Sequence, residues 1–180
     1  MKSLHDLLCD EIADAYDAEG QLTKALPKIA KAAQNEELRT AIESHLEETK
    51  EHVRLLEEAY QAIGESKKAK KCQAMVGLLK EGDELLSQYK DSPSLDAAII
   101  AAAQKVEHYE IATYGTLLAW ANQLELTDAA GIFETILKQE KAADAVLTEL
   151  ACDEINDTAE TGAEKQTGAA ETSASARRAR

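Results

Sequence analysis

Apolar residues recur every three to four positions through four long stretches of this sequence, which is the spacing of one face of an α-helix. The stretches run over about residues 4–33, 36–64, 94–124 and 127–151, and a shorter one covers 75–89. Only 4% of the residues are aromatic and there are 2 prolines, a composition that favours helix over sheet. The sequence therefore predicts an all-α four-helix bundle with a short helix in the crossover between its two halves.

Residues with helix-capping chemistry stand at the boundaries of these stretches. Ser3 precedes the first, Asn35 the second, and Thr127 or Asp128 is expected to cap the last. Pro27 falls inside the first stretch, where the missing backbone donor is expected to bend or weaken the helix.

The last 25 residues have a different composition. From 156 to 180 the only apolar residue type is Ala, among Thr, Ser, Gly, Gln and Glu. Such a segment has no side chains with which to build a core. The sequence predicts one folded domain over residues 1–155 and a disordered polar tail over 156–180.

Net charge and cysteine usage exclude several kinds of partner. The formal charge of −14 opposes binding to nucleic acid or to anionic membrane surfaces. No apolar run approaches the roughly 20 residues needed to span a bilayer. The three cysteines are widely spaced and follow no secretory signal, which favours a reducing, cytoplasmic location.

Ionisable residues interrupt the apolar stripe of every long helix. These residues are Glu19 on the first, His45, Glu48 and His52 on the second, Glu107 and Glu110 on the third, and Glu140 and Asp144 on the fourth. One such residue would indicate a side chain at the edge of its stripe that reaches solvent. Interruptions in all four stripes indicate a common cause.

The spacing of four of these carboxylates places them at one level of the bundle. Glu19 lies about 15 residues before the first turn and Glu48 about 14 after it, so both are about 21 Å from that turn. Glu110 and Glu140 flank the second turn at similar distances. The two halves thus repeat in pattern, as a pseudo-twofold arrangement requires.

Several buried carboxylates at one level need cations, bound protons or water to offset their charge. Two iron or manganese ions meet this need, because both accept carboxylate and imidazole ligands. A Glu on two helices and a Glu-plus-His pair on the others is the known arrangement of di-metal carboxylate bundles. His45 and His52 have three open roles, as ligands, as hydrogen-bond partners of a carboxylate or as packed core residues, whereas His108 is expected to point outward.

At this point the chain resembles the YciE/YciF-like stress-response proteins of the ferritin-like, rubrerythrin-like superfamily. The resemblance covers about residues 3–155. It rests on Asp14-Ala15-Tyr16, Ala18-Glu19 with Gln21-Leu22, His45-Leu46-Glu47-Glu48-Thr49, Ala103-Gln104-Lys105-Val106-Glu107-His108-Tyr109-Glu110-Ile111-Ala112, and Glu140-Lys141-Ala142 with Asp144. It implies a ferritin-like di-metal bundle, a homodimer and a link to stress.

One departure from the superfamily leaves two functions open. In the Glu-x-x-His ligand motif an imidazole follows the glutamate by three residues, but here Glu51 follows Glu48 and Ala143 follows Glu140. The first function is a di-metal oxidoreductase that reduces peroxide or uses dioxygen to oxidise ferrous iron. The second is a non-catalytic dimeric stress protein that buffers metal or binds partners.

Overall fold

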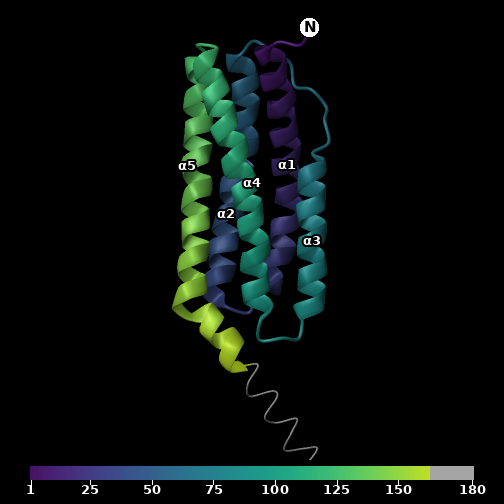
Figure 1. Ribbon diagram of the computed structural model, residues 1–180, viewed down its shortest axis with the longest axis vertical. Coiled ribbons are helices and arrows are strands. Elements are labelled where there is room, and N and C mark those ends of the chain that lie inside the picture. The colour runs from purple at the N-terminus through teal and green to yellow at the C-terminus, as the bar shows by residue number, and fades with distance from the viewer. Residues whose placement is uncertain (163–180) are drawn as a thin grey trace, which may run out of the picture.

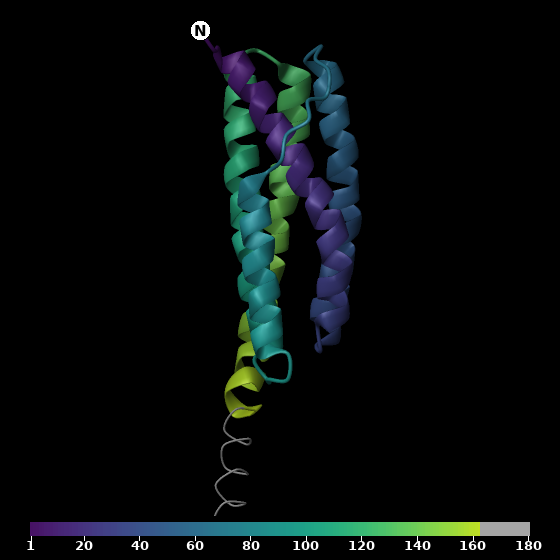
Figure 2. The same cartoon turned by 90° about the vertical axis from the view of Figure 1, so that its right-hand side faces the viewer.

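The computed structural model describes residues 1–162 and shows a bundle of four long helices with a shorter helix along its side (Figure 1). The helices are α1 (Leu4–Ala32), α2 (Glu36–Ala62), α3 (Gln73–Tyr89), α4 (Leu95–Gln123) and α5 (Thr127–Leu150). Around the bundle α1 neighbours α2, α2 neighbours α5, α5 neighbours α4, and α4 closes onto α1. The crossover helix α3 packs on α4 and α1 (Figure 2). The predicted all-α helical bundle with a short crossover helix is confirmed.

Side-chain caps fix the starts of α1 and α2 where the sequence predicts them. The Ser3 hydroxyl accepts from the Asp6 N–H at 3.1 Å, and the Asp6 carboxylate accepts from the Ser3 N–H at 2.8 Å, which closes a capping box. Asn35 caps α2 through the Leu38 N–H at 2.9 Å. Helix α1 continues without interruption through the exposed Pro27.

The predicted cap of α5 is wrong. Its N-cap is Leu126, and neither Thr127 nor Asp128 caps the helix with its side chain. The chain instead reverses through Glu125, which has a positive φ of 58°, and the Leu126 N–H donates to the Ala121 carbonyl at 2.9 Å. Backbone hydrogen bonds at the end of α4 therefore shape this turn, a feature that residue types alone did not indicate.

A buried aspartate joins the two halves of the bundle at one end. Asp96, in the first turn of α4, accepts from the backbone N–H groups of Gln34 and Asn35, both at 2.8 Å. These two residues form the turn between α1 and α2. The sequence showed Asp96 only as a charge within an apolar stretch, and the fold gives it this partner 61 residues away.

We expect Asp96→Ala to lower the free energy of unfolding by about 2–3 kcal/mol, because two hydrogen bonds to a charged acceptor are lost and two backbone donors are left unpaired. Urea unfolding of the variant and of wild type measures the difference. Asp91→Ala removes an exposed aspartate in the preceding turn and serves as the control. A loss below about 0.5 kcal/mol, the usual range for surface changes, would contradict this role.

Helical structure extends past the predicted end of the folded domain. After α5 a π-helical turn, Ala151–Ile155, leads into further helix over residues 156–162. Ile155 is buried in the core, and a helix that has already formed extends over polar residues at little cost. Residues 156–162, which the sequence analysis assigns to the tail, are therefore helical, while residues 163–180 of the predicted tail lie outside the described residues. Among the helices described, none is long and apolar enough to cross a membrane.

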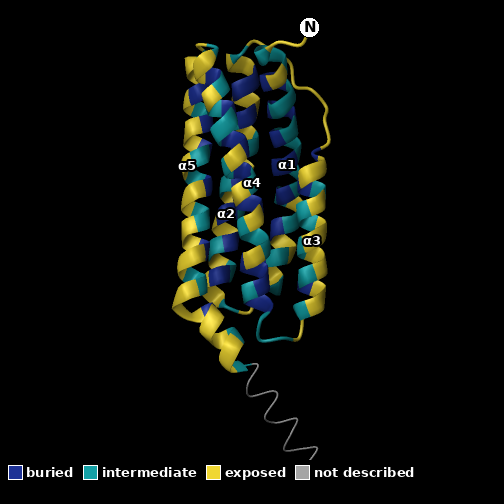
Figure 3. Ribbon diagram, viewed as in Figure 1, coloured by how far each residue is buried: buried dark blue, intermediate teal, exposed yellow. Residues whose placement is uncertain are grey.

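Two apolar clusters fill the bundle on either side of a polar layer. One cluster gathers around Leu26, Ile42 and Ile99, and the other around Leu56, Leu117 and Phe133. Buried positions follow the inner face of each long helix through both clusters (Figure 3). Between the clusters, the same inner faces carry ionisable side chains. The packing of the two clusters therefore fixes where these side chains meet.

Candidate metal centre

Six ionisable side chains lie buried together in the polar layer. They are Glu19 from α1, His45 and His52 from α2, Glu107 and Glu110 from α4, and Glu140 from α5. The most accessible of them, His45, is only 8% exposed. All six belong to the predicted ligand set, and the four long helices direct these six side chains into one buried layer.

The first group in this layer consists of Glu19, His52 and Glu140. His52 Nδ1 lies 3.3 Å from Glu19 Oε1 and 3.0 Å from Glu140 Oε1. The other ring nitrogen, Nε2, lies 3.1 Å from the side-chain oxygen of Gln139, a contact that the sequence did not reveal. The Tyr114 hydroxyl donates to Glu19 Oε1 and so orients this carboxylate. The three charged groups can offer their ligand atoms within 4.8 Å of one another.

The second group consists of His45, Glu107, Glu110 and Glu140, again with ligand atoms within 4.8 Å of one another. His45 Nε2 lies 3.4 Å from Glu107 Oε1 and 4.0 Å from Glu140 Oε2. Glu140 thus belongs to both groups, and it turns Oε1 toward His52 and Oε2 toward His45. A carboxylate placed in this way can bridge two cations.

Glu48 does not take the buried position that the sequence predicts. Its side chain is 41% exposed, and Oε2 lies 3.6 Å from His45 Nδ1 at the rim of the layer. At 3.6 residues per turn Glu48 and Thr49 lie on opposite sides of the line through His45 and His52, each about 50° from it. Helix geometry alone therefore does not choose between them, and the packing of α2 turns Thr49 inward. Thr49 is accordingly buried, and its hydroxyl donates to the His45 carbonyl at 2.9 Å.

Asp144 also stays outside both groups. Its side chain is 22% exposed, it accepts from Gln104 Nε2 at 3.1 Å, and it lies 3.4 Å from His108 Nε2. His108 is largely exposed, in keeping with its predicted outward orientation. Asp144 and His108 thus form a polar pair on the outer side of α4 and α5. Asp144 still adds negative charge near Glu107. The pKa of Glu107 is raised mainly by burial and by Glu140, and Asp144 makes a smaller contribution in the same direction.

Comparison with known proteins identifies relatives that share this fold. A family profile described as "Domain of unknown function (DUF892)" matches residues 3–160. The chain belongs to the DUF892 family. It is 44% identical over 161 residues to Protein YciF of Escherichia coli strain K12, covering 89% of this chain and 97% of that protein. The resemblance to YciE/YciF-like proteins is thereby confirmed.

Two solved structures extend the family comparison. The crystal structure of the E. coli stress protein YciF has a TM-score of 0.83 at 43% identity, over 87% of this chain and 99% of that one. A Rhodopseudomonas palustris protein titled YcfI, a putative structural protein, has a TM-score of 0.78 at 44% identity, over 82% and 94% of the two chains. The helical bundle is thus shared with experimentally determined relatives.

Burial dominates the electrostatics of the polar layer in this DUF892 member. It raises the pKa of Glu107 to about 10, with Glu140 adding to the effect, and it also raises the pKa of Glu19 and Glu110. Burial alone would lower the pKa of His52, but its contacts with Glu140 and Glu19 raise it to about 10. Without a cation the layer therefore retains protons at neutral pH.

Many polar atoms of the layer make no well-directed hydrogen bond among the residues described, even where a ring nitrogen lies close to a carboxylate oxygen. They are Glu19 Oε2, both nitrogens of His45, His52 Nδ1, Glu107 Oε2 and both oxygens of Glu110 and Glu140. Leaving a buried polar atom unpaired costs about 1–3 kcal/mol. Cations between these atoms remove that cost, and carboxylate plus imidazole donors suit iron and manganese. The residues present therefore fit the implied metal pair.

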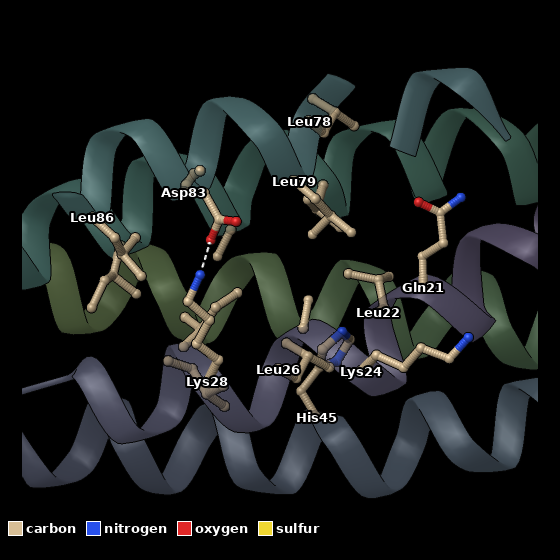
Figure 4. A pocket seen from close by; sticks show the side chains of 18 of the residues that line it. Gln21, Leu22, Lys24, Leu26, Lys28, His45, Leu78, Leu79, Asp83 and Leu86 are labelled. Carbon is tan, nitrogen blue, oxygen red and sulfur yellow. Dashed lines mark hydrogen bonds and ion pairs between the residues drawn. The ribbon is translucent and has the colours of Figure 1, made fainter. Parts of the chain in front are cut away.

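Two cavities lead from the surface to the second group. The larger, of about 390 Å³, lies between α1, α3 and α4 and reaches His45 and Glu107. Its walls are mainly Leu, Ile and Ala side chains, and an exposed ion pair of 2.6 Å between Lys28 and Asp83 joins α1 and α3 beside it (Figure 4). The smaller, of about 190 Å³, reaches the same two residues past α2 and α5. The His45–Glu107 edge is therefore the side from which a small molecule can approach.

Proposed function

We propose that this protein is a ferritin-like stress protein that binds two iron or manganese ions in the polar layer. Glu19, His52 and Glu140 hold one ion, and His45, Glu107, Glu110 and Glu140 hold the other. The observation that supports this most directly is Glu140, which directs a different oxygen to each group. The unpaired carboxylate and imidazole atoms around it are the donors that such ions take.

Neighbouring residues prepare the ligands for this role. A neutral His52 that carries its proton on Nε2 donates to Gln139 and leaves Nδ1 free for a cation. Tyr114 holds one oxygen of Glu19 and leaves Oε2 without a partner. In this arrangement α2 supplies both imidazoles, which replaces the missing Glu-x-x-His pairs of the superfamily.

The reaction we propose is a small-molecule oxidoreduction that uses peroxide or dioxygen. Iron or manganese held by these residues would supply the electrons for such chemistry, and ferrous iron or a second peroxide molecule would restore them. The two cavities give a small oxidant access to the His45–Glu107 edge, while the buried Glu19–His52 side stays closed. A metal-buffering protein without turnover is the second candidate, and the half-exposed Glu48 beside His45 favours it as a point of metal exchange.

We expect the chelator-stripped protein, reloaded anaerobically with ferrous iron or Mn²⁺, to hold about two ions per chain. Glu140→Gln removes the shared carboxylate and is expected to reduce the content to below about half an ion, because both groups lose a ligand. Elemental analysis after desalting measures the content. Glu48→Gln is the matched control, since it makes the same change on a side chain outside both groups.

Wild type and Glu140→Gln holding equally little metal would contradict the metal centre. Stopped-flow measurement of peroxide consumption and ferrous oxidation separates the two candidate functions. Turnover that depends on the bound metal and disappears in Glu140→Gln supports the oxidoreductase. Metal binding without such turnover rules out the oxidoreductase and leaves the buffering protein.

A further inference from the structure

A second cluster of metal-ligand side chains lies at the opposite end of α1 from the turn to α2. It consists of His5 and Cys9, one helical turn apart on α1, and Glu65, which follows α2. Their ligand atoms lie within 4.8 Å of one another. Glu19 is ten residues beyond Cys9, about 15 Å along the helix, so this cluster is separate from the polar layer.

The distance between the cysteine and the histidine matches two ligands of one zinc ion. Cys9 Sγ lies 3.7 Å from His5 Nδ1. In a tetrahedral site with a Zn–S bond of about 2.3 Å and a Zn–N bond of about 2.0–2.1 Å, sulfur and nitrogen are separated by about 3.6 Å. The helix therefore presents these two donors at a spacing that needs little adjustment.

The end of α2 holds the third donor next to the first two. Gly64 has a positive φ of 72°, a conformation that glycine adopts without strain. The following N–H, that of Glu65, donates to the Tyr60 carbonyl at 3.0 Å. This C-terminal cap fixes the backbone of Glu65 and directs the chain back across the start of α1. A long-range contact thus brings a carboxylate to a His–Cys pair 56 residues earlier in the chain.

The surroundings of the cluster favour a cation. Cys9 is 1% exposed, and its Sγ contacts His5 Nδ1. Tyr60, whose carbonyl accepts from the Glu65 N–H, is also buried, and its hydroxyl has no hydrogen-bond partner in the described part of the chain. The cluster therefore offers a cation one thiol, one imidazole and one carboxylate around a buried position.

We propose that His5, Cys9 and Glu65 bind one Zn²⁺ ion per chain, with water as the fourth ligand. Sulfur and imidazole donors select zinc, whereas the carboxylate-rich polar layer suits iron or manganese. The bound ion joins the start of α1 to the end of α2, so it stabilises the native state. This site does not depend on the metal centre proposed above.

Cobalt substitution gives a direct test on the full-length, metal-free protein. We expect one equivalent of Co²⁺ to produce a thiolate-to-cobalt charge-transfer band in wild type, and Zn²⁺ to displace it. The band is expected to disappear in Cys9→Ser and to remain in Cys72→Ser and Cys152→Ser, which remove the other two thiols. A band that persists in Cys9→Ser would overturn the proposal.

Zinc affinity gives the second readout. Competition with a chromophoric chelator is expected to show at least about a tenfold loss of affinity in Glu65→Gln, an exposed position whose change leaves the fold intact. Glu140→Gln is expected to keep the cobalt band and the tight zinc equivalent. Loss of both in Glu140→Gln, with retention in Glu65→Gln, would assign the ion to the polar layer and refute the second site.

Discussion

Without bound metal, the protein is expected to lose stability steadily as the pH rises from about 5 to about 10. Glu19, Glu107 and Glu110 have raised pKa values in the folded state, and so does His52. A group with a raised folded pKa binds more protons when folded than when unfolded, so its stabilising effect is complete below the unfolded pKa and is lost as the pH rises. Glu107 loses it from about pH 4.5 and His52 from about pH 6.5, both up to about pH 10, and Glu19 and Glu110 add to the loss in the same direction.

The expected size of this effect is large. Each such group changes the free energy of unfolding by about 1.4 kcal/mol per pH unit. The summed loss of stability between pH 6 and 9 is therefore expected to be at least about 1.4 kcal/mol. Chemical denaturation at several pH values in the presence of a chelator measures it. In the metal-loaded protein the ionised carboxylates are bound to cations, so the stabilisation by metal is expected to grow with pH.

A neutral substitution within the layer provides the internal control. Glu110→Gln mimics the protonated side chain, so the metal-free variant is expected to be more stable than wild type at pH 8 and to have a shallower pH slope. Glu48→Gln, on a half-exposed side chain, leaves the slope unchanged. A flat pH profile for the metal-free wild type would contradict the protonated state of the layer.

The second large effect is the selective loss of one ion at a time. Glu19→Gln removes a ligand of the first group only, and Glu107→Gln one of the second group only. Each variant is expected to hold about one ion per chain. The ion of the altered group is expected to bind at least about 100-fold more weakly, because a charged ligand is lost from a site with few donors. Anaerobic titration followed by elemental analysis gives both quantities.

Paramagnetic coupling distinguishes this outcome from a general loss of affinity. With two Mn²⁺ ions bridged by Glu140, wild type is expected to show a spin-coupled electron paramagnetic resonance signal. Both single variants are instead expected to show the electron paramagnetic resonance signal of an isolated Mn²⁺ ion. Variants that each keep two ions, or that each lose both, would contradict the division into two groups that share Glu140.

Helical periodicity by itself determined the architecture of this protein. The apolar stripes predicted the four long helices and the short crossover helix close to their observed ends, because burying one face of each helix dominates its packing. Family resemblance, carried by short motifs around Glu19, His45, Glu107 and Glu140, agreed with the DUF892 match. Both signals are local in sequence, so one chain is enough to reveal them.

Only the tertiary structure decided which polar side chains meet. An apolar stripe is about 100° wide, so it does not distinguish a residue at its centre from one at its rim. The rotation of α2 about its own axis, set by its packing on α1 and α5, turns His45, Thr49 and His52 inward and leaves Glu48 half-exposed. The pseudo-twofold pattern treated Glu48 and Glu140 as equivalent, yet only Glu140 reaches both groups.

The same reason explains the contacts that the sequence did not reveal. Asp96 meets the α1–α2 turn, and Glu65 meets His5 and Cys9, through separations of more than 50 residues. Sequence spacing locates a residue along and around its own helix, but the partner depends on how all the helices pack together. Local sequence therefore determined the helices and the side chains they carry, whereas the packed bundle determined which of those side chains meet.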